Sequence, residues 1–92
     1  MGLPAESPGQ IGCFLAERYL PVLSTQALTS RVDQDRAAAC ALSIRHVQTI
    51  YVPSDETCFT LFEAPSLDLV TEANDRFGLG YRRVAPAIAI SS

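Results

Sequence analysis

Three side chains in this sequence have the chemistry to hold a metal ion: His46, Glu17 and Glu63. His46 is the only histidine, and imidazole is the one side chain whose unperturbed pKa lies near neutrality. Glu17 and Glu63 each interrupt an apolar run that reads as a central strand, where a carboxylate costs free energy unless it is paired or binds an ion. A structural role remains open for all three. The arginines that could neutralise the carboxylates are Arg18, Arg45, Arg82 and Arg83.

No motif indicates catalysis. The sequence has no phosphate-binding glycine loop, no GxSxG, no HExxH and no calcium-binding EF-hand loop. The three cysteines, Cys13, Cys40 and Cys58, are widely spaced and form no CxxC pair, so we expect reduced thiols that pack as small apolar groups. We therefore expect a protein that binds rather than catalyses, with no assigned catalytic residue.

Composition narrows the class of protein further. With 92 residues, 48% of them apolar, the chain has room for one domain, which we expect at residues 12–92 after a flexible tail at 1–11. A net charge of −3, with seven arginines and no lysine, argues against a nucleic-acid partner. No apolar run reaches the ~20 residues of a membrane helix, and the first residues lack the features of a secretion signal. A cytoplasmic location is expected.

A strand, a tight turn and a second strand are predicted in the middle of the chain. The apolar runs 47–52 and 58–62 flank a turn at Pro53, Ser54 and Asp55. A turn centred on Asp55 would pair Val52 with Cys58 and Ile50 with Thr60. It would place Ile50 and Val52 on the face of Cys58 and Phe62, and it would place His46 opposite Ala64.

Two helices and two further strands complete the pattern. The run 13–20 is prone to form a strand, and a helix capped by Ser24 or Thr25 extends to about Leu42. Its apolar stripe is Leu28, Val32, Ala39 and Leu42, and Asp35 is expected on the solvated flank with Arg31. A second helix runs from Ser66 to Gly78, with an apolar stripe of Leu67, Val70, Ala73 and Phe77. Residues 82–90 alternate as a last strand.

The order βαββαβ predicts an α+β, ferredoxin-like sandwich. Its antiparallel four-stranded sheet has the order 4-1-3-2, with both helices on one face. Pro86 fits this topology, because proline in a strand is tolerated mainly at a sheet edge. Both faces of the hairpin are apolar, although two helices can cover only one, so a homodimer through the other sheet face is expected.

Three segments of the sequence are similar to a known family: ERYLP at 17–21, the block VPSDETCFTLFEAPS at 52–66, and LVTEANDRFGL at 69–79 followed by RV. They resemble the small bacterial nickel-binding proteins, a family otherwise described as a domain of unknown function. The resemblance covers about residues 13–90. It implies a ferredoxin-like dimer that binds nickel or another divalent metal without an established reaction. The chain departs from the pattern at Thr60, where many relatives carry histidine.

Two hypotheses follow. The first is a metal-binding homodimer, with nickel as the possible cofactor, that uses His46 together with Glu17 or Glu63. The second is a small-molecule binder or cofactor-free enzyme of the dimeric α+β barrel type, with its pocket between the sheet and the second copy.

Overall fold

The chain forms four strands and two α-helices in the computed structural model, which describes residues 11–21, 24–88 and 90. Most of the predicted N-terminal tail, residues 1–10, lies outside the described residues. A short 3₁₀ turn, η2, joins the second and third strands. The elements in chain order are β1 (Gly12–Tyr19), α1 (Thr25–Ala41), β2 (Arg45–Val52), η2 (Pro53–Asp55), β3 (Thr57–Ala64), α2 (Leu67–Phe77) and β4 (Arg83–Ala87).

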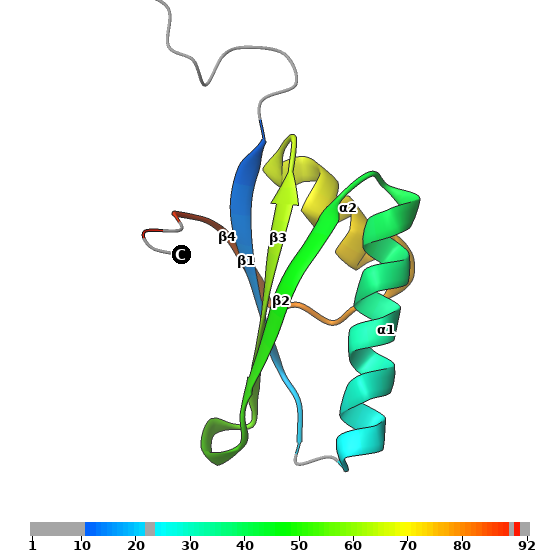
Figure 1. Ribbon diagram of the computed structural model, residues 1–92, viewed down its shortest axis with the longest axis vertical. Coiled ribbons are helices and arrows are strands. Elements are labelled where there is room, and N and C mark those ends of the chain that lie inside the picture. The colour runs from blue at the N-terminus through cyan, green and yellow to red at the C-terminus, as the bar shows by residue number, and fades with distance from the viewer. Residues whose placement is uncertain (1–10, 22–23, 89, 91–92) are drawn as a thin grey trace, which may run out of the picture.

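The strands form one antiparallel sheet in the order β2-β3-β1-β4. Read from the β4 edge, this is the order 4-1-3-2. Both helices pack against the same face of the sheet (Figure 1). The arrangement is a small α+β fold of the ferredoxin-like kind. Pro86 belongs to the edge strand β4, where its missing N–H removes no central hydrogen bond.

Local signals set the ends of both helices. The Ser24 hydroxyl accepts a hydrogen bond from the backbone N–H of Ala27 at 3.1 Å, and the Ser66 hydroxyl accepts one from Leu69 at 3.4 Å. Gly78 ends α2 in the left-handed conformation, at a φ of 61°. The predicted caps are thus confirmed, and on α2 Arg76 also forms an ion pair with Glu72 at 3.1 Å. Phe77 differs from prediction, because its side chain is 44% exposed.

The predicted hairpin forms, but its predicted register is wrong. Val52 pairs with Thr57 and Ile50 with Phe59, one position from the expected partners. The loop holds four residues rather than five, because Glu56 closes it in the left-handed conformation at a φ of 51°. A bulge between residues 46 and 48 shifts the pairing again, so that His46 lies opposite Phe62.

This register corrects the composition of the two sheet faces, because a shift of one residue moves side chains to the other face. Ile50 and Val52 share a face with Phe59 and Leu61, not with Cys58 and Phe62 as expected. We call the side of the sheet away from the helices the open face. Its side chains, which include hydrophobic residues from every strand, are Cys13, Leu15, Glu17, Tyr19, Arg45, Gln48, Ile50, Val52, Thr57, Phe59, Leu61, Glu63, Arg83, Ala85 and Ala87.

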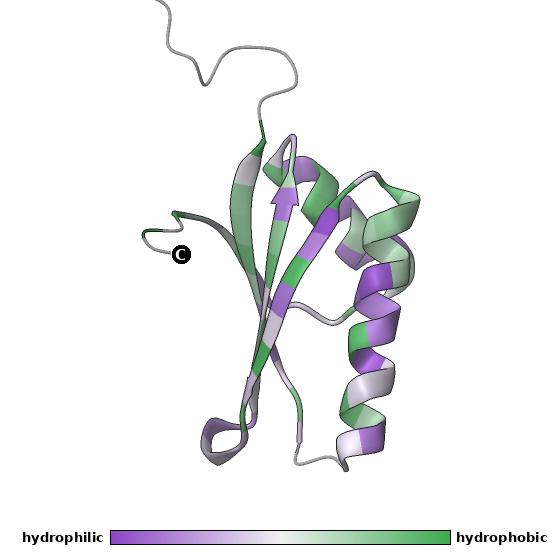
Figure 2. Cartoon of the chain, in the orientation of Figure 1, coloured by the Kyte–Doolittle hydropathy of each residue, from purple (hydrophilic) through white to green (hydrophobic). Residues whose placement is uncertain are grey.

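The core lies between the two helices and the face of the sheet that they cover. Figure 2 shows hydrophobic residues separated by more hydrophilic ones along β2, and the hydrophobic Ile50 and Val52 of this strand lie on the open face rather than in the core. Large side chains anchor the centre of the core, and alanines allow the helices to approach the strands. The buried cluster is Phe14, Ala16, Ala38, Ala39, Ile44, Phe62, Ala64, Val70, Ala73, Leu79 and Tyr81.

Candidate functional site: a buried polar chain and an open sheet face

A fully buried ion pair joins β1 to α1 in the middle of this core. Arg18 and Asp35 are 1% and 0% exposed. The two terminal nitrogens of the guanidinium donate to the two carboxylate oxygens, each at 3.0 Å. One of these nitrogens also donates to the backbone carbonyl of Leu79 at 2.9 Å, and the guanidinium carbon lies 5.0 Å from the centre of the Tyr81 ring. The pair therefore links β1, α1 and the segment that follows α2.

The prediction that Asp35 lies on the solvated flank of its helix is wrong. Leu28, Val32 and Ala39 form an apolar stripe along α1. Asp35 lies in this stripe between Val32 and Ala39, seven residues after Leu28. Arg18 lies two residues after Ala16 and four after Phe14 on β1, so its side chain faces the helices as theirs do. Both signals were present in the sequence, and only their combination indicates a buried pair.

Hydrogen bonds extend from Asp35 to the only histidine. The Thr60 hydroxyl donates to Asp35 at 3.4 Å and lies 3.3 Å from the Thr49 hydroxyl, which lies 2.7 Å from Nε2 of His46. The ring of His46 packs edge-on against Phe62. Burial, followed by the positive charge of Arg36, lowers the pKa of His46 below its usual 6.5. The imidazole is therefore favoured in its neutral form.

The groups around Asp35 have little acid–base capacity. Burial raises the pKa of Tyr81, and the nearby Asp35 carboxylate raises it further. Burial also raises the pKa of the Cys58 thiol. Both oxygens of Asp35 are already bonded to Arg18, so the carboxylate is not free to act as a base. We therefore interpret these hydrogen bonds around Asp35 as structural contacts that hold α1 against the sheet.

The three predicted metal ligands are not brought together within the chain. His46 pairs with Phe62 and lies on the helix side of the sheet, whereas Glu17 and Glu63 lie on the open face. Each carboxylate has an arginine partner: Arg82 donates to Glu17 at 2.9 Å, and Arg45 donates to Glu63 at 2.6 Å. The sequence left open that arginines neutralise these carboxylates, and the structure shows such a partner for both.

Thr60, the position at which the sequence departs from the family pattern it resembles, is fully buried, and its hydroxyl donates to Asp35. Nowhere in residues 11–21, 24–88 and 90 do three or more histidine, cysteine, aspartate or glutamate side chains gather closely enough to hold a metal ion.

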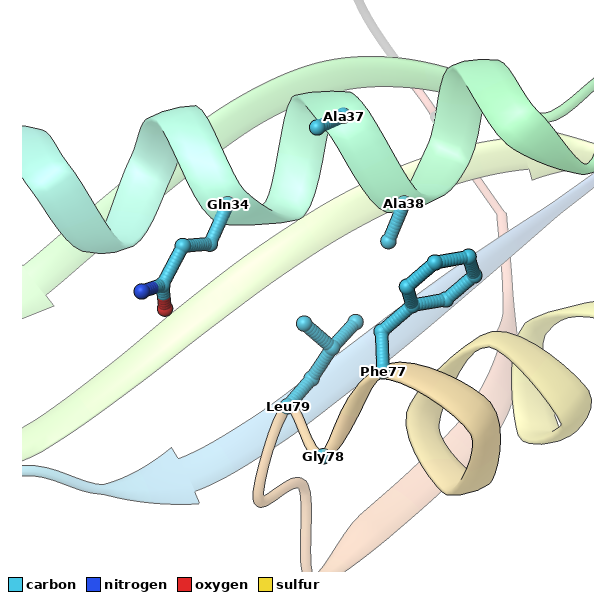
Figure 3. Close-up of a pocket in the computed structure, with 6 residues that line it drawn as sticks. All are labelled: Gln34, Ala37, Ala38, Phe77, Gly78 and Leu79. Atoms are coloured by element: carbon cyan, nitrogen blue, oxygen red, sulfur yellow. The ribbon is translucent and has the colours of Figure 1, made fainter.

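Two of the hollows on the surface formed by the described residues bear on ligand binding. The larger, of about 370 Å³, lies between α1 and the end of α2 and is lined by Gln34, Ala37, Ala38, Phe77, Gly78 and Leu79 (Figure 3). Phe77 and Leu79 point toward the small alanines of α1, which leave the space unfilled. Its lining has no charged side chain, so the cleft offers no acid–base or metal chemistry.

The smaller hollow, of about 190 Å³, is a groove on the open face. It runs along β1 and β4 and is lined by Leu15, Glu17, Arg83, Ala85, Pro86 and Ala87. Alanines on β4 lie beside the larger Leu15 of β1, so the groove has an apolar floor and a charged end.

The cysteines differ in exposure, and their reactivity is expected to follow it. Cys40 is exposed, Cys13 is partly buried and Cys58 is fully buried, and all three are free thiols. Because the thiolate is the reactive form, the raised pKa and the burial of Cys58 both slow its reaction. In a thiol-labelling time course of the native protein, Cys40 should react first and Cys58 only when the protein is unfolded in urea. Labelling of Cys58 as fast as Cys40 would contradict the packing.

Comparison with known proteins supports the fold. No protein-family model matches the chain, and no curated protein matches it. None of the helices within residues 11–21, 24–88 and 90 is long and apolar enough to cross a membrane. The crystal structure of SCO4226 from Streptomyces coelicolor A3(2) is similar to this chain, with a TM-score of 0.74 and 18% sequence identity over 87% of this chain and 99% of that one. At this identity the likeness shows that the two chains share a fold.

Proposed function

We propose that the protein is a homodimeric binding protein of the dimeric α+β barrel type, with its ligand site between the open faces of two sheets. The apolar open face is the observation that carries the proposal. Leu15 is 37% and Ile50 52% exposed on a face that neither helix covers (Figure 1). Monomers rarely leave large apolar patches in water, and a second copy of the same surface is the simplest cover.

The free thiols fit the cytoplasmic location proposed for this dimer. Cys13 lies on the open face and would approach the second copy, while Cys40 is exposed on α1. Thiols persist in a reducing compartment, whereas small exported domains commonly convert theirs to disulfides.

A divalent metal ion, nickel first, is the ligand that the sequence resemblance favours. Glu17 and Glu63 are the candidate donors that face the second copy. Glu63 lies opposite Cys13, four residues along β1 from Glu17, so the two carboxylates are about 13 Å apart along the strand. One ion would therefore need a carboxylate from each copy. Such an oxygen-rich site has modest affinity, with nickel bound more tightly than manganese, iron or cobalt.

Calorimetric titration of the untagged protein with nickel tests this assignment. Glu17→Gln or Glu63→Gln should weaken nickel binding by about tenfold or more, because each removes a charged oxygen donor. His46→Ala should leave the affinity unchanged, since His46 lies on the other side of the sheet. Loss of nickel binding in His46→Ala alone would place the ion on the helix side and contradict the interface site.

A small organic molecule is a second candidate ligand, for a binder or for a cofactor-free enzyme. The observation that favours it is the groove along β1 and β4, which a second copy on the open face would close. Its mixture of an apolar floor with few polar groups is typical of small-molecule sites.

A further inference from the structure

We infer that the groove along β1 and β4 binds a short aliphatic carboxylic acid, with its carboxylate on Arg83 and its hydrocarbon chain on the alanines of β4. This inference names a chemical class for the small organic ligand proposed above. It rests on the proposed function, because the second copy closes the groove. It depends on the charges at one end of the groove and on the shape of the rest.

Charge identifies the end that would hold the carboxylate. Glu17 and Arg83 are register partners on β1 and β4, so both side chains lie on the open face at the same level. Glu17 is already engaged by Arg82, which donates to Oε2 at 2.9 Å. Arg83 has no ion-pair partner within the part of the chain that the structure describes. The three groups together carry a net charge of +1, in a chain whose net charge is −3.

The charge at this end of the groove favours a carboxylate over a phosphate group. Arginine presents a planar pair of N–H donors that matches two anion oxygens, and such charged hydrogen bonds are about twice as strong as neutral ones. The net charge of +1 balances the single charge of a carboxylate, whereas a phosphate group carries about −1.5 to −2 at pH 7.

Shape identifies the rest of the ligand. Beyond Arg83 the groove floor is formed by Ala85 and Ala87, with Leu15 opposite Ala85 on the neighbouring strand. These groups offer hydrophobic contact and no further charge. The volume of about 190 Å³ is below the ~300–1,000 Å³ of a complete ligand pocket, so the groove fits a chain of a few carbon atoms.

Titration with sodium hexanoate tests the inference, with hexanol as the matched neutral probe. Binding is followed by calorimetry and by the methyl resonances of Leu15, Ala85 and Ala87. Hexanoate should shift these resonances, and hexanol should bind at least about tenfold more weakly because it cannot form the charged pair. Equal affinity for the two probes would overturn the assignment of the carboxylate.

Three variants locate the site. Arg83→Gln should weaken hexanoate binding by about tenfold or more, and Ala85→Leu should abolish it by filling the groove. Arg31→Gln is the control: Arg31 is an exposed arginine of α1, on the other side of the sheet, and its loss should change nothing. Circular dichroism establishes that each variant is folded. Equal weakening by Arg83→Gln and Arg31→Gln would overturn the site.

Molar mass separates this inference from the proposed dimer. Light scattering is measured on each sample used in the titrations. A monomeric protein that binds hexanoate in the groove would overturn the dimer and leave the groove site standing. A dimer with unchanged methyl resonances in hexanoate would overturn the groove site and leave the dimer standing.

Discussion

Asp35→Asn is expected to lower the free energy of unfolding by about 3–5 kcal/mol, because it leaves the Arg18 guanidinium buried without a compensating charge. Arg18 is 1% exposed, so water cannot replace the lost carboxylate unless the core opens. A domain of this size has a total stability of only ~5–15 kcal/mol, and the variant should approach or cross the limit of folding. Urea unfolding followed by circular dichroism measures the change.

Two further variants make this expectation specific. Asp33→Asn removes an exposed carboxylate from the same helix, 3.7 Å from Arg36, and should change stability by less than about 0.5 kcal/mol. The double variant Arg18→Met with Asp35→Leu replaces both charges by apolar groups and should recover much of the loss, because no unpaired charge remains buried. If Asp35→Asn were as stable as Asp33→Asn, the ion pair would not hold β1 against α1.

Ile50→Glu is expected to convert the proposed dimer into a folded monomer. Ile50 is 52% exposed on the open face of the protomer, so a glutamate there remains hydrated while the protein is monomeric. In the dimer the same carboxylate would be buried against an apolar sheet, and an unpaired buried charge costs several kcal/mol. Because an interface with two-fold symmetry contains each substitution twice, the effect is doubled.

Light scattering at micromolar concentration measures this change in molar mass. Wild-type protein should have twice the 9.9 kDa mass of the chain, and Ile50→Glu should have the mass of one chain. Phe77→Glu is the matched control, since Phe77 is 44% exposed but belongs to α2 on the other side of the sheet, and it should remain dimeric. A monomeric wild-type protein, or a monomeric Phe77→Glu variant, would contradict an interface on the open face.

The architecture could be predicted because its signals are local. The apolar periodicity of each segment, the serine caps at Ser24 and Ser66, and the glycine stop at Gly78 are determined by neighbouring residues. Alternation of strands and helices then leaves few topologies, and Pro86 agrees with an edge position for β4. Element type and order therefore follow from short stretches of sequence.

The details of the sheet could not be predicted in the same way. Whether Thr57 belongs to the hairpin loop or to the strand depends on Glu56, which closes the loop in a left-handed backbone conformation that glutamate adopts rarely. That one residue moves every pair of the β2–β3 hairpin, and the bulge before Gln48 moves His46 once more. Because side chains alternate between the faces of a strand, these two features decided which residues share the open face.

The candidate sites likewise depended on contacts between distant elements. Glu17, Glu63 and His46 were recognisable from the sequence as residues able to bind metal, but the fold places His46 on the opposite side of the sheet from the carboxylates. Local sequence patterns are sufficient to predict where the helices and strands form and that one sheet face is left apolar. The burial of Asp35 depends on the fold, because a carboxylate in an apolar stripe is stabilised only when another element supplies Arg18 beside it.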